Sequence, residues 1–287
     1  MISIQILCSG TPTPSATRWG SAYALQMGNG WFMFDCGPAA TYKLVKSGIS
    51  PLEVSHLFFT HHHSDHDADY ACFLLSRFDM SIGEESNLQV YGPPPTNALT
   101  QKLIGENDGA YWHDFVARTK HPLSLWAYQN RGGNLPRKIP EVNAHDLKSG
   151  EIINGPGWTI KCSRVEHVQP YLDSIAYRVN TNEGTIVFSG DTRPCQSLTD
   201  LASGTDVLVM ECIRLEKEML GNATSASESS ALSAGKIAEE AGVKMLVLTH
   251  QAHYLDNLKD EVIKEVRLNY NGRIEWANET TLISYKG

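Results

Sequence analysis

The sequence has little positive charge, no paired cysteine motif and no long apolar run. Its 287 residues include 24 Lys and Arg against 32 Asp and Glu, a formal net charge of −8 with neutral histidine. This balance argues against nucleic acid as the main partner, because phosphate backbones are bound by Lys and Arg. Bound divalent cations would still add positive charge locally. None of the six cysteines lies in a C-x-x-C pair, which excludes zinc-ribbon and thioredoxin motifs.

Membrane and secretion signals are also missing from the sequence. No stretch reaches the roughly 18 consecutive apolar residues of a membrane-spanning helix. The first residues, "MISIQILCSG", lack the basic region of a signal peptide. We therefore expect reduced cysteines, no membrane contact and a cytoplasmic location. The apolar fraction of 41% is sufficient for a sizeable core, and the length suits one α/β domain spanning residues 1–287.

Strand-like and helix-like segments alternate along most of the chain. The segment "SASESSALSAGKIAEEAG", residues 225–242, is predicted to be one helix that ends at Gly242. Residues 96–140 differ, because they are rich in aromatic residues and end in "NRGGNLPRK". We interpret them as an insertion of helices followed by a loop, a composition found in lids and binding loops as well as in ordinary packing.

In the segment "SHLFFTHHHSDHDADY", Ser55–Tyr70, four histidines and three aspartates follow directly on a short buried strand. His61 and His63 are two positions apart, so both side chains can point the same way in extended backbone. Asp65 and His66 then begin a helix. Imidazole and carboxylate groups suit zinc, manganese or iron. A solvated loop is the alternative, whereas a calcium loop is excluded because Tyr70 stands where a glycine is needed.

Three further apolar strands are each followed by one histidine or aspartate. These residues are His167 after "WTIKCSRV", Asp191 in "SGDT" and His250 after "MLVLT". Each one alone could be a turn or capping residue. Together they indicate one site, because strand ends in layered α/β folds gather at an edge where ligands bind. Seven donors are too many for one zinc ion and suit two.

This pattern resembles the metallo-β-lactamase superfamily. The matching features are H-x-H-x-D-H after a strand, the distant histidine, S-G-D-T and L-T-H. The stretches "GTPTP" (10–14) and "FDCG" (34–37) are similar to the branch that contains ribonuclease Z. The resemblance covers nearly the whole chain outside the insertion. It implies an αβ/βα sandwich, an α/β fold of two mixed sheets with helices on the outer faces.

The resemblance also implies a ligand set and a chemistry. One metal ion would be held by His61, His63 and His167, a second by Asp65, His66 and His250, and Asp191 would bridge them. Two such divalent ions, zinc by default and otherwise manganese or iron, would lower the pKa of a shared water, so that a metal-bound hydroxide attacks the substrate. Asp65 would accept a hydrogen bond from this nucleophile and orient it.

Two departures separate the chain from ribonuclease Z. That enzyme carries a long arm between the third metal histidine and the bridging aspartate, whereas His167 and Asp191 here are only 24 positions apart. Ribonuclease Z also has a histidine in an H-x-T stretch, and Glu228 stands near that place. Glu228 is then either a proton donor or an exposed carboxylate at a helix start. His253 is a second proton-transfer candidate, and Trp112 and His113 are candidates for covering the site and binding substrate.

The sequence therefore predicts a dinuclear metal-dependent hydrolase acting on a small molecule. A phosphodiester is the first expectation, followed by an ester, lactone or β-lactam. One alternative is a ribonuclease Z-type endonuclease that processes transfer-RNA 3′ ends. Another is a non-catalytic binding module, which the completely filled ligand set disfavours. We expect a small-molecule partner and not nucleic acid. We also expect a homodimer, because related proteins in this branch are often dimeric and the insertion offers apolar surface.

Overall fold

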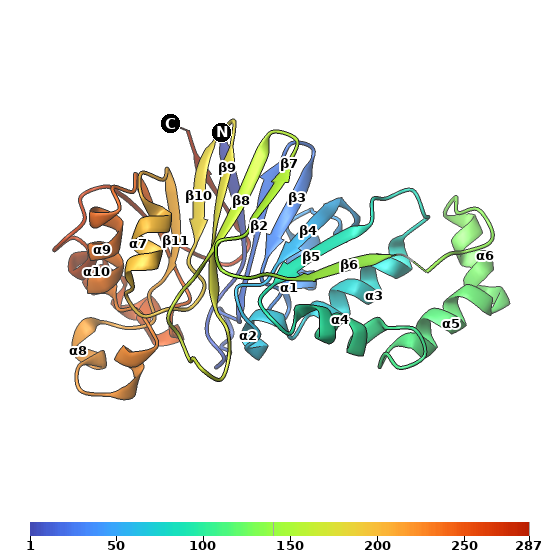
Figure 1. Ribbon diagram of the computed structural model, residues 1–287, viewed down its shortest axis with the longest axis horizontal. Coiled ribbons are helices and arrows are strands. Elements are labelled where there is room, and N and C mark those ends of the chain that lie inside the picture. Colours follow the sequence, from blue (N-terminus) through green and yellow to red (C-terminus); the bar gives the residue numbers. More distant parts are fainter. Residues whose placement is uncertain (140, 287) are drawn as a thin grey trace.

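Two seven-stranded mixed sheets pack face to face in the computed structural model, which describes residues 1–139 and 141–286 (Figure 1). The first sheet has the order β14-β1-β2-β3-β4-β5-β6. Its strands are β1 (Ile2–Ser9), β2 (Ser21–Met27), β3 (Gly30–Phe34), β4 (Val54–Phe58), β5 (Leu88–Gly92), β6 (Val142–Asp146) and β14 (Thr281–Tyr285). The second sheet has the order β13-β12-β11-β10-β9-β8-β7. Its strands are β7 (Ile152–Gly155), β8 (Trp158–Arg164), β9 (Ile175–Thr181), β10 (Gly184–Phe188), β11 (Val207–Glu211), β12 (Met245–Thr249) and β13 (Arg273–Trp276).

The helices lie on the outer faces of the two sheets and at one end of the first. They are α1 (Ala40–Lys46), α2 (Ser64–Asp67), α3 (Tyr70–Met80), α4 (Thr96–Ile104), α5 (Trp112–Lys120), α6 (Pro122–Asn130), α7 (Gln196–Ala202), α8 (Glu216–Met219), α9 (Ala231–Glu240) and α10 (Lys259–Val266). Short 3-10 helices are η1 (Pro51–Glu53), η2 (Ala223–Ala226) and η3 (His253–Leu258). Within the described ranges, no helix is long and apolar enough to cross a membrane.

The core consists of three apolar layers. The layer between the sheets is rich in aromatic side chains, and the rings of Phe34 and Phe188 stack across it with centroids 3.9 Å apart. Side chains of α1 and α3 pack on the outer face of the first sheet, and those of α7, α9 and α10 cover the second. Replacing Phe34 with alanine would leave a cavity and destabilise the fold by about 3–5 kcal/mol. The predicted αβ/βα sandwich is confirmed.

Strand direction brings the ends of several strands to one edge. In the first sheet β3, β4, β5 and β6 run parallel, and in the second sheet β10, β11, β12 and β13 do. β8 and β10 are both antiparallel to β9, so these two also point the same way. The segments that follow β4, β8, β10 and β12 carry the predicted ligands, and they therefore emerge together.

The insertion forms α4, α5 and α6 between β5 and β6. Phe115 of α5 packs on Phe78 of α3 with ring centroids 4.6 Å apart, and the hydroxyl of Tyr128 in α6 donates to the Ile82 carbonyl at 2.9 Å. These contacts fix α5 and α6 at the C-terminal end of α3. Figure 1 shows both helices projecting beyond the sheets, with α4 between them and α2.

The helix predicted for residues 225–242 is shorter than expected. α9 begins at Ala231, because the hydroxyl of Ser230 accepts a hydrogen bond from the Ser233 backbone N–H at 3.1 Å and caps the helix there. The preceding residues form η2 and a loop. Glu228 therefore lies in the loop and not on a helix.

Candidate metal centre

One loop after β4 supplies four of the seven predicted ligands. His61 and His63 lie in the extended segment that leaves the strand, and Nε2 of His61 is 3.1 Å from Nδ1 of His63. Asp65 and His66 follow on the short helix α2, where both side chains are buried. His62 points elsewhere, with Nδ1 3.1 Å from Asp67 Oδ2 and Nε2 2.8 Å from Thr96 Oγ1. His61 and His63 therefore face the site while His62 faces away, as their alternating positions predicted.

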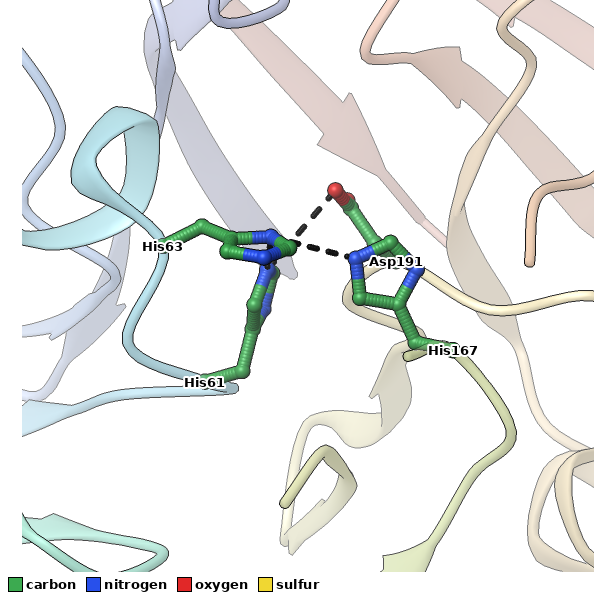
Figure 2. Close-up of side chains that lie close together, drawn as sticks. All are labelled: His61, His63, His167 and Asp191. Atoms are coloured by element: carbon green, nitrogen blue, oxygen red, sulfur yellow. Dashed lines mark hydrogen bonds and ion pairs between the residues drawn. The ribbon is translucent and has the colours of Figure 1, made fainter. Parts of the chain in front are cut away.

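Three separate strand ends of the second sheet supply the remaining ligands. His167 follows β8, Asp191 follows β10 and His250 follows β12. Nε2 of His167 lies 3.1 Å from Nδ1 of His63, and Figure 2 shows these rings, His61 and Asp191 pointing toward one another. On the other side of Asp191, its Oδ2 lies 3.2 Å from Nε2 of both His66 and His250.

The donor atoms fall into two groups that share Asp191. The first group is His61, His63, His167 and Asp191, and the second is Asp65, His66, Asp191 and His250. Within each group the ligand atoms all lie within 4.8 Å of one another. This grouping is the one that the family resemblance implies, and Asp191 is in the position of a bridge.

The outward-facing nitrogens fix the orientation of several rings. Nδ1 of His66 donates to Asp35 Oδ2 at 2.8 Å, and Nδ1 of His167 donates to the Ser227 carbonyl at 2.9 Å. Nδ1 of His61 lies 3.0 Å from Thr60 Oγ1, and this hydroxyl donates to Asp35. With the proton held outward, Nε2 of each ring presents a lone pair to the centre.

The inward lone pairs of the histidine nitrogens converge with no hydrogen-bond donor between them, and such an arrangement suits a bound cation. Nδ1 of His63 lies 3.1 Å from Nε2 of both His61 and His167, a distance at which neutral rings with inward lone pairs repel. Asp65 Oδ1 is buried and has no hydrogen-bond partner among the described residues. Nitrogen and carboxylate oxygen donors without thiolate suit zinc and other divalent first-row ions. The residues present therefore fit a two-metal site.

Charges at the centre perturb several pKa values strongly. Burial and the neighbouring His66 lower the pKa of His61 well below its ordinary value. Burial would also lower the pKa of His250, but the carboxylates of Asp191 and Asp65 raise it to about 9. Burial alone would raise the pKa of Asp191, yet His250 and His66 hold it well below the usual range. The carboxylates of Asp191 and Asp65, which favour protonated histidines here, also attract divalent cations. Metal ions therefore compete with protons for these ligands.

Strained backbone occurs at two residues of the site. Asp35, which follows β3, has φ 59°, and His250 has φ 57°. Residues other than glycine pay about 1 kcal/mol or more for this left-handed conformation. The cost is offset because Asp35 fixes His66 and Thr60, with the Thr60 backbone N–H donating to Asp35 Oδ1 at 2.7 Å.

Glu228 lies beside the centre with a second buried carboxyl group, Glu211. Oε1 of Glu228 is 3.6 Å from Nδ1 of His167, and ligand atoms of Asp191, Glu211 and Glu228 lie within 4.8 Å of one another. Burial, then Glu228 and Asp191, raise the pKa of Glu211 well above its ordinary value. Burial, then Asp191, also raise the pKa of Glu228. One proton held between the two would satisfy both Oε2 atoms, which have no other partner among the described residues.

The expectation of an exposed helix-start carboxylate at Glu228 is therefore wrong. Its side chain is 14% exposed and comes from the loop before α9. Sequence reasoning missed Glu211 and Asp35. Glu211 ends the apolar strand β11, and Asp35 follows β3, so both obey the strand-then-acid pattern that singled out Asp191.

The remaining candidate residues lie outside both donor groups. Trp112 and His113 begin α5, in the pair of helices that packs at the C-terminal end of α3. Figure 1 shows α5 and α6 standing away from α2, so within this chain these two helices do not cover α2. His253 is exposed at the start of η3.

A family model for the β-lactamase superfamily domain matches residues 30–251. The chain belongs to the metallo-β-lactamase superfamily, as its fold and donor set indicate. It is 31% identical to a ribonuclease Z of Mycobacterium sp. (strain KMS) over 255 residues, which cover 87% of this chain and 84% of that relative.

Two solved structures show the same fold at lower identity. The metallo-β-lactamase fold protein YhfI from Bacillus subtilis has a TM-score of 0.74 at 21% identity, with 98% of each chain covered. The short form of human tRNase Z has a TM-score of 0.69 at 19% identity, again with 98% of each chain covered. The chain therefore carries the His and Asp metal site of a hydrolase superfamily on a sandwich common to these proteins.

Proposed function

We propose that this protein hydrolyses a phosphodiester bond in a small molecule with two divalent metal ions, zinc first among them. The observation that supports this most is the pair of donor groups sharing Asp191. Two ions bound there would supply a water of lowered pKa and stabilise the charge that develops on the phosphoryl oxygens. An ester, lactone or β-lactam is the next substrate class, because the same charge develops on a carbonyl oxygen.

Residues of the chain would orient the reaction. Oδ1 of Asp65 has no hydrogen-bond partner among the described residues, so it can accept a hydrogen bond from the attacking water and orient it. Asp35, Thr60 and the Ser227 carbonyl hold three of the imidazoles in fixed tautomers. Glu228, beside His167, is a candidate for holding the proton that the leaving group requires.

The preference for a small substrate rests on the connection between His167 and Asp191. It consists of a loop followed by the β9–β10 hairpin, whose strands pair from Thr181 and Gly184 onward. This segment holds no extended arm for gripping a transfer RNA. The formal charge of −8 also provides no general attraction for one.

A ribonuclease Z-type endonuclease is the second candidate, and the 31% identity to a protein of that name favours it. The experiment compares kcat/KM on bis(p-nitrophenyl) phosphate and on a transfer-RNA precursor, using zinc-loaded and manganese-loaded protein. Our proposal expects efficient turnover of the small diester and poor cleavage of the precursor. Efficient cleavage at the 3′ boundary of the precursor, with little turnover of small esters, would establish the second candidate instead.

A homodimer remains our prediction for assembly. Leu123 and Trp126 on α6 are 65% and 61% exposed, which is apolar surface that association could cover. Light scattering at tens of micromolar should give twice the mass of the chain, and replacing Trp126 with serine should shift the equilibrium toward the monomer. A monomeric mass for the unmodified protein would contradict this prediction.

A further inference from the structure

A polar cleft opens directly beside the candidate metal centre. It has a volume of about 550 Å³ and reaches His167, which ties it to the first donor group. Its lining residues include two arginines, Arg164 at the end of β8 and Arg193 two residues after Asp191. Glu166 is the carboxylate in the wall. The cleft therefore places two arginines and one glutamate next to a candidate ligand, His167, in a protein whose net charge is negative.

Arg164 has a guanidinium group that the fold does not use. Its backbone N–H donates to Ser149 Oγ at 2.9 Å, and its carbonyl accepts from Ser197 Oγ at 2.7 Å. In the described residues, 1–139 and 141–286, its side chain makes neither a hydrogen bond nor an ion pair. Five N–H donors in a rigid, planar group are thus free for an anion with several oxygens.

Arg193 is bound only loosely. It forms an ion pair with Glu166, and the two side chains are 48% and 49% exposed. Exposed pairs of this kind contribute little free energy because solvent screens them. A phosphate entering the cleft could therefore draw Arg193 away from Glu166 and bind between two guanidinium groups, which favour phosphate geometry.

We propose that this cleft binds a second anionic group, a phosphate, on the substrate whose phosphodiester lies at the metal centre. This proposal rests on the proposed function for the position of the scissile bond. It defines the substrate class more narrowly, as a small phosphodiester that carries a further phosphate, such as a nucleotide diester with a second phosphorylated hydroxyl.

A matched pair of substrates tests the proposal. Thymidine 5′-(p-nitrophenyl phosphate) and its 3′-phosphorylated form share one scissile diester and differ only by the second phosphate. We expect kcat/KM to be about tenfold higher for the 3′-phosphorylated form, as is typical for a charge-assisted hydrogen bond. Arg164→Gln should remove this preference. Lys161→Gln, which removes the same charge from an exposed position on the same strand, should keep it.

Equilibrium binding separates failure of the cleft from failure of the proposed function. By calorimetry on zinc-loaded protein, thymidine 3′,5′-bisphosphate should bind about tenfold more tightly than thymidine 5′-monophosphate, and Arg164→Gln should lose the difference. This readout needs no turnover. If no diester is hydrolysed but the binding difference is present, the proposed function fails and the anion site stands. Equal binding of the two nucleotides to the unmodified protein, or an unchanged difference in a folded Arg164→Gln variant, would overturn the site.

Discussion

The two halves of the sandwich supply the candidate ligands in different ways. The first sheet contributes four of them from one loop of six residues, His61–His66, after β4. The second sheet contributes three, one each after β8, β10 and β12. The ligands of the first half therefore form a continuous sequence motif. Those of the second half are far apart in sequence and are brought together by the order and direction of the strands.

This difference determines what supports each group. The ligand loop is held partly by contacts within the loop and α2, such as the hydrogen bond between His62 and Asp67, five positions later. His62 also bonds to Thr96, 34 positions later. The ligands of the second sheet depend on strand register and on neighbours far away in sequence. His167, for example, donates to the carbonyl of Ser227, 60 positions later. We expect substitutions in the second half to act through such distant partners.

Asp191 is the residue at which the two halves meet, and Asp191→Asn should have the largest effect. A neutral amide cannot bridge two cations as a carboxylate does, so both ions should bind more weakly. We expect metal content to fall from about two ions per chain toward zero and phosphodiesterase activity to fall about 10³-fold or more. Elemental analysis and steady-state kinetics measure these effects. Asp173→Asn, an exposed change in the loop after β8, should alter neither, and a fully metal-loaded Asp191→Asn variant would contradict the bridge.

Adjacent histidines in the ligand loop should differ sharply. His61→Ala removes an inward-facing imidazole and should lower activity by about a hundredfold or more, with loss of bound metal. His62→Ala removes hydrogen bonds to Asp67 and Thr96, which should cost about 1 kcal/mol of stability and less than tenfold in activity. Metal content and thermal melting distinguish the two. Equal loss of metal in both variants would show that our ligand register is wrong.

The comparison also explains what the sequence could and could not predict. His61, His63, Asp65 and His66 were recognisable because local spacing alone places them together. His167, Asp191 and His250 needed the knowledge that parallel strand ends meet at one edge. Glu211 has the same strand-end pattern as Asp191, but an acidic residue at a strand end is usually solvated, so its burial could not be inferred locally.

The errors in prediction have tertiary causes. The aromatic insertion resembles a lid in composition, yet Phe115 packs on Phe78 and Tyr128 binds the Ile82 carbonyl, contacts that place α5 and α6 away from α2. Composition carries no information about the direction in which an insertion leaves the sheet. Similarly, Ser230 caps α9 later than its serine-rich sequence implied, and this leaves Glu228 in the loop beside His167.

Glu228→Gln tests whether the ligands of the second sheet depend on partners that are distant in sequence. The substitution keeps the shape of the side chain but removes the carboxyl group beside His167 and Glu211. We expect kcat/KM on a small phosphodiester to fall about tenfold with metal content retained, because no proposed ligand is lost. Glu240→Gln, on the exposed side of α9, is the matched control. Full activity of the Glu228→Gln variant would exclude a role in proton transfer, and loss of metal would indicate that Glu228 acts through the ligand His167.

The smallest expected effect concerns His56, which lies five residues before His61 on β4 but belongs to the layer between the sheets. Its ring packs against Phe32 and Trp158, with centroids 4.2 and 5.3 Å away. Burial lowers the pKa of His56 from 6.5 to about 4. Between pH 6.5 and about pH 4, His56 is therefore protonated in the unfolded chain but neutral in the folded chain. The folded state loses stability as the pH falls through this window, because the unfolded state binds the extra proton.

His56→Gln removes this titrating group and should flatten the acid loss. Because the ring is partly accessible to solvent, we expect a difference of about 1 kcal/mol between pH 7.5 and pH 5. Urea unfolding of both proteins at both pH values, in chelator, gives this difference directly, since the other histidines contribute equally to each protein. A constant offset between the variant and the unmodified protein at the two pH values would mean that His56 titrates normally. In that case the layer between the sheets does not shield His56 on β4 from water.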